Sequence, residues 1–197
     1  MLGCSSLYRY SGLQLSTMSK PYIQVDISTQ QLHFFGEVQR SYSISTALNG
    51  VGEQEGSGCT PRGQHVVSDK IGAGQPINSV FVGRVPTGEI YTNELAEQYP
   101  QRDWILSRIL WLYGIEPQFN QGTGCDSHSR YIYIHGTPDT EPMGIARSHG
   151  CIRMRNSDVI ELFDLVEVGT RVDIFEQLDD SLRNLIFNEN ISGKNCL

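Results

Sequence analysis

The residues best suited to chemistry in this sequence are a cysteine, two histidines and an arginine that lie close together. Cys151 is preceded by His149 and followed by Arg153, and His135 ends an apolar segment a short way upstream. A cysteine becomes an effective nucleophile when a neighbouring base removes its proton and when dipoles stabilise the thiolate. The spacing therefore predicts a Cys–His catalytic pair built on Cys151.

The residues alone leave alternatives open for this cluster. A buried structural cysteine is the commonest fate of this side chain, but such a cysteine does not need His, Gly and Arg around it. His135 and His149 are both candidate bases, and a metal site of these histidines with Cys151 is an alternative that lacks a recognisable ligand spacing. Backbone N–H groups at a turn ahead of a helix could stabilise the thiolate and later an oxyanion.

Arg153 is a candidate for substrate binding. It alternates with Ile152, so the two side chains cannot face the same side of an extended segment. If the guanidinium faces a cleft, it can bind a substrate carboxylate through two parallel hydrogen bonds. The alternative is a solvated surface arginine.

Composition limits the class of protein. The 197 residues carry 15 basic and 22 acidic side chains, a formal net charge of -7, and no Lys/Arg cluster. This argues against a nucleic-acid partner. No apolar run approaches the roughly 20 residues that a membrane-spanning helix needs. We therefore expect a soluble, monomeric globular protein with one substantial core.

Cysteine spacing and the first residues bear on the compartment. The cysteines are Cys4, Cys59, Cys125, Cys151 and Cys196, and no C-x-x-C pair occurs. Their spacing argues against a zinc knuckle or a disulfide framework, although Cys59 and Cys125 could pair in an oxidising compartment. Residues 1–18 lack the apolar run of a secretory signal, so we expect a cytoplasmic protein, or a periplasmic one if an upstream signal is missing. Met18 is a candidate natural start.

The alternation of apolar and polar residues predicts a mainly β chain. We expect strands at residues 22–27, 31–35, 40–46, 64–68, 80–85, 104–113, 130–135 and 171–175. The first three strands form a β-meander, the glycine-rich residues 49–63 form a loop, and residues 94–99 form a short helix. The segment 104–113 fits either a helix or a buried strand, and its Ile and Trp content favours the strand.

One longer helix is expected after the cysteine. Asn156-Ser157-Asp158 is typical of a helix N-cap, residues 159–166 have helical apolar spacing, and Gly169 closes the element. We expect residues 86–129 to form part of a cleft wall. The predicted organisation is a disordered extension over residues 1–19, one catalytic domain over residues 20–177, and a weakly helical or frayed tail over residues 178–197.

These motifs resemble a known enzyme family. Ile134-His135-Gly136-Thr137, followed after a loop by Ser148-His149-Gly150-Cys151-Ile152-Arg153-Met154, is similar to the signature of the L,D-transpeptidase catalytic domain, the YkuD family. Thr60-Pro61-Arg62-Gly63 is similar to the T-P-x-G turn of that family. The resemblance covers about residues 21–176 and implies a YkuD-like β-sandwich or barrel with one helix after the cysteine and a short helical cover.

The resemblance also implies roles for single residues. Cys151 would attack the carbonyl between the L-centre of meso-diaminopimelate and a terminal D-alanine in a peptidoglycan stem peptide. His135 would be the base, and the carbonyl of Gly136 would orient its ring. Backbone N–H groups of His149, Gly150 and Cys151 would form the oxyanion region. The implied substrate contacts are Ser148, Gly150 and Arg153. The implied partners are muropeptides, and no cofactor or metal is implied.

The acceptor of the acyl group decides the product. A thioester at Cys151 resolved by an amine gives a cross-link or exchanges a D-amino acid, whereas one resolved by water makes an L,D-carboxypeptidase. Because neither an export signal nor a wall-binding module is seen, we expect trimming of tetrapeptides to tripeptides in cytoplasmic peptidoglycan recycling. The alternatives are a periplasmic cross-linking enzyme and an inactive muropeptide-binding module, and the intact His135/Cys151 pair argues against the latter.

Overall fold

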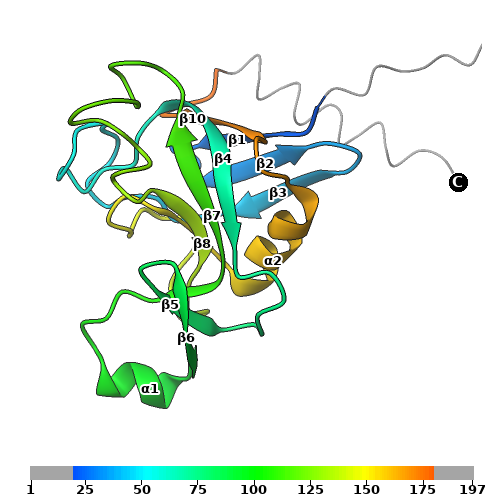
Figure 1. Cartoon of the computed structure of the whole chain (residues 1–197), viewed down its shortest axis with the longest axis vertical. Helices are drawn as coiled ribbons and strands as arrows, with labels where there is room; N and C mark the ends of the chain where they lie inside the picture. Colours follow the sequence, from blue (N-terminus) through cyan, green and yellow to red (C-terminus); the bar gives the residue numbers. More distant parts are fainter. Residues whose placement is uncertain (1–19, 180–197) are drawn as a thin grey trace, which may run out of the picture.

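The computed structural model describes residues 20–179, which form a strongly curled sheet with two helices (Figure 1). The strands are β1 (Tyr22–Asp26), β2 (Gln31–Phe35), β3 (Gln39–Ser43), β4 (Gly63–Ile71), β5 (Ser79–Val82), β6 (Val85–Ile90), β7 (Ile105–Gly114), β8 (Tyr133–Gly136), β9 (Ile152–Met154) and β10 (Arg171–Phe175). The helices are α1 (Asn93–Gln98) and α2 (Asn156–Leu165). The mainly β architecture, the helix after the cysteine and the short helix elsewhere are confirmed.

The sheet has a branched topology. Its strands follow the order β3-β2-β1-β10-β4-β7-β5-β6, and β8 pairs with both β7 and β9 off this path. The predicted meander is confirmed as β1 to β3, with antiparallel pairs. Ile23 and Val25 are fully buried on β1, whereas Tyr22 and Gln24 are partly exposed, which is the period of a half-buried strand.

The ambiguous segment 104–113 is the strand β7, as its β-branched and aromatic content favoured. It pairs with β4, β5 and β8, so protein covers most of its length and its apolar residues run almost without alternation. A bulge interrupts its pairing with β8, and Ser107 within the bulge has a φ of 64°. This bulge lies opposite His135 and Gly136.

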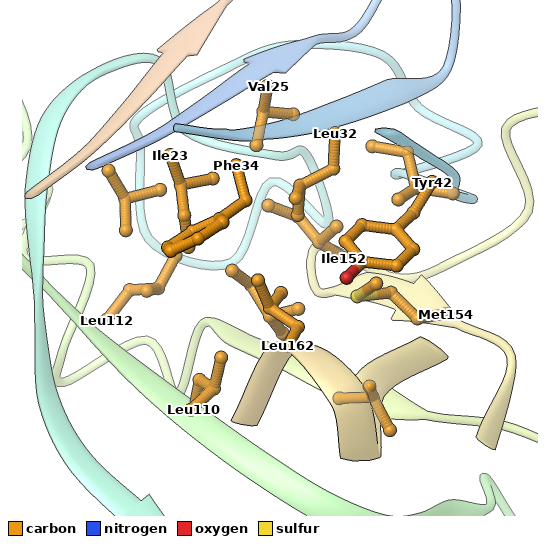
Figure 2. Packing of buried hydrophobic residues seen from close by; sticks show 14 of the residues in the cluster. Ile23, Val25, Leu32, Phe34, Tyr42, Leu110, Leu112, Ile152, Met154 and Leu162 are labelled. Atoms are coloured by element: carbon orange, nitrogen blue, oxygen red, sulfur yellow. The ribbon is translucent and has the colours of Figure 1, made fainter. Parts of the chain in front are cut away.

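The main core lies between the β1–β2 part of the sheet and α2 with β9 (Figure 2). The labelled side chains in Figure 2 are Ile23, Val25, Leu32, Phe34, Tyr42, Leu110, Leu112, Ile152, Met154 and Leu162. Each fully buried aliphatic side chain of this set contributes about 1.5–3 kcal/mol by leaving water. The strand that follows Cys151 is therefore anchored at its first and last residues, Ile152 and Met154.

The prediction of one strand over residues 80–85 is wrong. β5 ends at Val82, the chain turns at Gly83 and Arg84 with φ angles of 54° and 70°, and β6 begins at Val85. Positive φ at both central residues matches the two-residue hairpin turn that normally selects Gly, Asn or Asp. Gly83 fits this preference but Arg84 does not, so the sequence did not predict the hairpin.

Three boundaries near the site also differ from the predictions. Asn156 is the first residue of α2 and is buried, and Arg155 occupies the N-cap without a side-chain capping bond. The strand expected at 130–135 begins only at Tyr133, because the chain turns before it and Tyr131 has a φ of 58°. The helix ends at Leu165, ahead of Gly169.

Both predicted terminal segments, 1–19 and most of 178–197, fall outside the described residues. Within 20–179, neither helix has the length and apolar character that crossing a bilayer requires.

Candidate active site

Two parallel strands bring the predicted thiol and imidazole to one place. His135 lies on β8, Cys151 immediately precedes β9, and the two strands pair with His135 opposite Arg153. His135, Cys151 and Arg153 all line one cleft of about 490 Å³. Residues 137–151 separate the two strands in the sequence, and the pairing of the strands closes this loop and assembles the site.

The thiol of Cys151 rests against the backbone of the segment that leads into the strand carrying His135. Its Sγ accepts a hydrogen bond from the backbone N–H of Tyr133 at 3.4 Å and donates one to the carbonyl of Tyr131 at 3.3 Å. Burial raises the pKa of Cys151 to about 12, a shift that the Tyr133 N–H opposes only in part. At neutral pH the resting thiol is therefore protonated.

His135 is held in one tautomer. Its side chain is buried, and Nδ1 lies 2.8 Å from the carbonyl oxygen of Gly136. A carbonyl only accepts hydrogen bonds, so we assign the proton to Nδ1 and the free lone pair to Nε2. Burial lowers the pKa of His135 to about 4. The ring is thus a neutral imidazole with Nε2 available as a base.

The turn before Cys151 is fixed by side-chain hydroxyls. Ser148 Oγ donates to the carbonyl of Cys151 at 2.5 Å and accepts from the N–H of Gly150 at 3.3 Å. Thr60 Oγ1 donates to the carbonyl of Gly150 at 2.9 Å and accepts from the N–H of Ala47 at 3.0 Å. Gly150 has a φ of 135°, which only glycine adopts readily.

These contacts set the direction of one amide. The carbonyl and N–H of a trans peptide point in opposite directions, so the hydroxyl of Thr60 on the Gly150 carbonyl fixes where the N–H of Cys151 points. Within the described residues, no protein acceptor engages the N–H groups of His149 and Cys151. The turn leads first into β9, and α2 begins only at Asn156, so a short strand separates the predicted turn from the helix that follows it.

Arg153 is buried, which excludes the solvated alternative. Its Nη2 lies 2.8 Å from Asp103 Oδ1 and its Nη1 lies 3.9 Å from Glu141 Oε2. The Nε of Arg153 is buried without a hydrogen-bond partner. Asp103 belongs to the segment 86–129, which therefore does contribute to the wall of the cleft, as expected from the sequence.

The two histidines occupy different environments. The side chain of His149 is 80% exposed, and its Nδ1 lies 3.8 Å from Asp103 Oδ2. It stands at the boundary between the cysteine cleft and a second cleft of about 320 Å³, whose lining includes Arg102 and Arg147. Of the two histidines, only His135 therefore combines burial and a fixed tautomer with a place in the cysteine cleft.

The structure also bears on the predicted alternatives of a metal site and of a disulfide between Cys59 and Cys125. Across residues 20–179, the His, Cys, Asp and Glu side chains form no group of three suited to a metal ion, so the alternative of a metal bound by His135, His149 and Cys151 gains no support. Cys59 and Cys125 are free thiols and are not bridged to each other.

Sequence reasoning missed several residues of the cleft. Arg84 and Tyr131 line it beside the cysteine, and neither belongs to a local motif. Asp103 was not assigned because only the fold brings it to Arg153. The sequence does single out the turn that contains Thr60, and the hydroxyl beside this turn was the available signal. The contact of this hydroxyl with Gly150 spans 90 positions in the chain, so no local pattern predicts it.

The comparisons with known proteins agree with the signature. A family model described as the L,D-transpeptidase catalytic domain (YkuD) matches residues 20–174. Curated relatives include "Probable L,D-transpeptidase ErfK/SrfK" of Escherichia coli K12, 52% identical over 48 residues, which are 24% of this chain and 16% of that protein. "Probable L,D-transpeptidase YbiS" of the same organism is 46% identical over 48 residues, with the same coverage. The matches thus span about a sixth of the length of these relatives.

Solved structures give weaker likenesses. The L,D-transpeptidase 3 of Mycobacterium tuberculosis, in complex with a faropenem-derived adduct, is 17% identical with a TM-score of 0.49, covering 79% of this chain and 60% of that chain. An L,D-transpeptidase from Mycobacterium smegmatis is 18% identical with a TM-score of 0.45, covering 79% of this chain and 58% of that chain.

Proposed function

Because the chain belongs to the L,D-transpeptidase catalytic domain family, we propose that residues 20–177 act on peptidoglycan stem peptides with Cys151 as nucleophile and His135 as general base. One observation carries this proposal. A neutral imidazole, with its Nδ1 proton held by the Gly136 carbonyl, shares a cleft with the thiol. A base in this state can accept the thiol proton through Nε2 as the sulfur attacks.

The first half-reaction releases D-alanine. Sγ of Cys151 loses its proton to Nε2 of His135 and bonds to the carbonyl carbon at the L-centre of meso-diaminopimelate. The C–N bond to the terminal D-alanine then breaks, and His135 returns the proton to the leaving amine. The product on the protein is a thioester. The free N–H groups of Cys151 and His149 support an oxyanion site, whereas the N–H of Gly150 is engaged by Ser148.

The other predicted substrate contacts have different roles in this proposal. Arg153 lines the cleft while its Nη2 is paired with Asp103, and in this proposal its guanidinium also contacts a substrate oxygen. Ser148 and Gly150 are buried in the turn. They position Cys151 and its amide rather than holding the peptide.

For the second half-reaction we propose water as the acceptor. Two residues that line the cleft are exposed to solvent: Tyr131 is 54% exposed, and the side chain of His149 is 80% exposed. Water therefore reaches the thioester without a dedicated acceptor site. His135 takes a proton from that water as the water oxygen bonds to the thioester carbonyl carbon. The C–S bond then breaks, and His135 returns the proton to the sulfur of Cys151, which restores the thiol. This makes the protein an L,D-carboxypeptidase that trims tetrapeptides to tripeptides, a step of cytoplasmic peptidoglycan recycling.

The second candidate is cross-linking by an amine acceptor, the reaction that belongs to a periplasmic location. The observation that favours it is the adjoining charged cleft, which shares Asp103, His149 and Arg153 with the cysteine cleft. A second stem peptide in this neighbouring cleft would bring its amine to the thioester.

Mass spectrometry of the products distinguishes these outcomes. The purified chain is incubated with a free tetrapeptide stem ending in meso-diaminopimelate and D-alanine, beside Cys151→Ala as control. We expect tripeptide and D-alanine from the unmodified chain and neither from the variant. If the products were cross-linked dimers without tripeptide, the reaction would be transpeptidation and the proposed hydrolysis would be wrong. An unmodified chain that binds the peptide but forms no product and no acyl adduct would identify a binding module.

A further inference from the structure

The hairpin between β5 and β6 brings a second cation into the cysteine cleft. Arg84 lies at the tip of this hairpin and lines the same cleft as Cys151. Its φ of 70° is a conformation that costs a non-glycine residue stability, and this turn position favours Gly, Asn or Asp. A residue that breaks the local preference at a cleft indicates a role for its side chain.

The guanidinium of Arg84 is held by aromatic rings. It lies 4.4 Å from the ring centre of Trp111 and 4.9 Å from that of Tyr131. Its Nη1 donates to Tyr133 Oη at 3.0 Å. These contacts fix the plane of the guanidinium. The aromatic rings attract its positive charge through their faces, so most of its five N–H donors stay available for hydrogen bonds.

Within the described part of the chain, Arg84 forms no ion pair, and Asp69 acts on its charge only from beyond ion-pair distance. Among residues 20–179, no acidic side chain lies within ion-pair distance of it. Arg153, the other arginine of the cleft, is paired with Asp103 at 2.8 Å. Of the two arginines that the described residues contribute to the cleft, Arg84 is therefore the one without an ion pair, although the family signature contains only Arg153.

Tyr133 links this cation to the nucleophile. Its hydroxyl accepts from Arg84, and its backbone N–H donates to the sulfur of Cys151 at 3.4 Å. The guanidinium and the thiol are thus separated by the length of one tyrosine side chain. A carboxylate one or two residues from the carbonyl under attack falls within that range.

We infer that Arg84 binds a carboxylate of the stem peptide next to the scissile bond and so selects the donor substrate. This inference rests on the proposed function and adds the residue that recognises the donor's charge. Several free carboxylates of a tetrapeptide stem have the required chemistry, among them that of the terminal D-alanine and that at the D-centre of meso-diaminopimelate.

Binding to a chain that cannot react tests the inference separately from catalysis. In the Cys151→Ala background, calorimetry measures the Kd of the tetrapeptide with Arg84 intact, with Arg84→Gly and with Arg84→Lys. We expect Arg84→Gly to raise Kd about 10- to 100-fold, the range for losing a charge-assisted pair of hydrogen bonds. The Kd of Arg84→Lys should lie between those of the protein with Arg84 intact and of Arg84→Gly, because lysine keeps the charge but lacks the planar guanidinium.

Several controls separate recognition from folding. Glycine suits the positive φ of this turn, so the loss of ring contacts is offset and Tm should stay close to that of the parent. The matched control is Arg40→Ala, which removes an exposed arginine paired with Glu161 on another part of the molecule. It should leave Kd unchanged.

Peptides with a carboxamide in place of one carboxylate identify the group that is bound. When the carboxamide replaces the carboxylate that Arg84 binds, Arg84→Gly should no longer affect binding. The Kd of that peptide should then be the same with Arg84 intact and with Arg84→Gly. Equal Kd values for the unmodified tetrapeptide in these two proteins, or no measurable binding, would overturn the inference. Turnover by the chain with Cys151 intact reports on the proposed function independently of these values.

Discussion

At the scale of single residues, the candidate site holds both of its reactive groups in neutral form. Burial raises the pKa of Cys151 to about 12 and lowers the pKa of His135 to about 4. A resting thiolate–imidazolium pair, which makes some cysteines reactive before substrate arrives, is therefore not formed at neutral pH. Proton transfer must accompany attack on the substrate.

The pH profile of the enzyme follows from these two pKa values. We expect kcat/KM for D-alanine release to stay level from about pH 8 to about pH 5, because His135 loses its basic form only as the pH falls through about 4. An ordinary histidine would lose it near about 6.5. A rate measured at half-unit intervals of pH checks this, and an acid limb centred near the ordinary histidine value would contradict it.

The same neutral pair affects how thiol labelling is interpreted. Iodoacetamide reacts with thiolate, so we expect it to alkylate Cys151 at neutral pH more slowly than glutathione in the same buffer. Slow labelling is then a property of the resting enzyme and does not identify an inactive binding module. Fast labelling at neutral pH would show that the thiol is already ionised, against the pKa of about 12.

At the scale of elements, the loop that leads into β4 supports the turn that carries Cys151. Thr60 is fully buried, and its hydroxyl joins the N–H of Ala47 to the carbonyl of Gly150. The proline and glycine that follow Thr60 turn the chain into β4. The T-P-x-G motif thus holds the turn that contains Cys151 in place.

Thr60→Val tests this support, since valine keeps the shape and removes the hydroxyl. We expect kcat to fall about tenfold or more with KM little changed, because the N–H of Cys151 loses its fixed direction. The buried N–H of Ala47 also loses its acceptor, which costs about 1–3 kcal/mol in the free energy of unfolding. Thr29→Val, at an exposed position, is the control and should change neither quantity. A stability loss with unchanged kcat would leave Thr60 a purely structural role.

Comparison of elements shows what the sequence can predict. The strands β1, β2 and β10 and the catalytic signature follow from local patterns, because alternation and motif spacing are local properties. The β5–β6 hairpin was missed because Arg84 adopts a conformation that its residue type disfavours. Asn156 looked like a cap, yet it is buried and bonds Ser107 and Thr137 across the structure. Contacts of that kind depend on tertiary packing and leave no local pattern.

At the scale of the whole molecule, folding buries two histidine rings almost completely in neutral form. One is His135. The other is His65 on β4, whose Nδ1 lies 3.0 Å from the carbonyl of Gly63 and whose Nε2 lies 2.9 Å from Ser127 Oγ. Burial lowers the pKa of His65 to about 4 as well. In the unfolded chain both rings titrate near about 6.5, so the unfolded state binds protons first as the pH falls.

The free energy of unfolding should therefore decrease as the pH falls from about 6.5, the unfolded value, to about 4, the folded one. The full stability is present above this range, and each histidine removes about 2 kcal/mol by about pH 5, where most carboxylates are still ionised. Urea unfolding at about pH 7.5, 6 and 5 measures this slope. His65→Asn should reduce the slope by less than half, whatever it does to stability at the highest pH, because His135 remains and burial also lowers the pKa of His33. A free energy that stays flat over this range would mean that these rings are protonated in the native state, and the neutral base on which the chemistry at Cys151 depends would be lost with it.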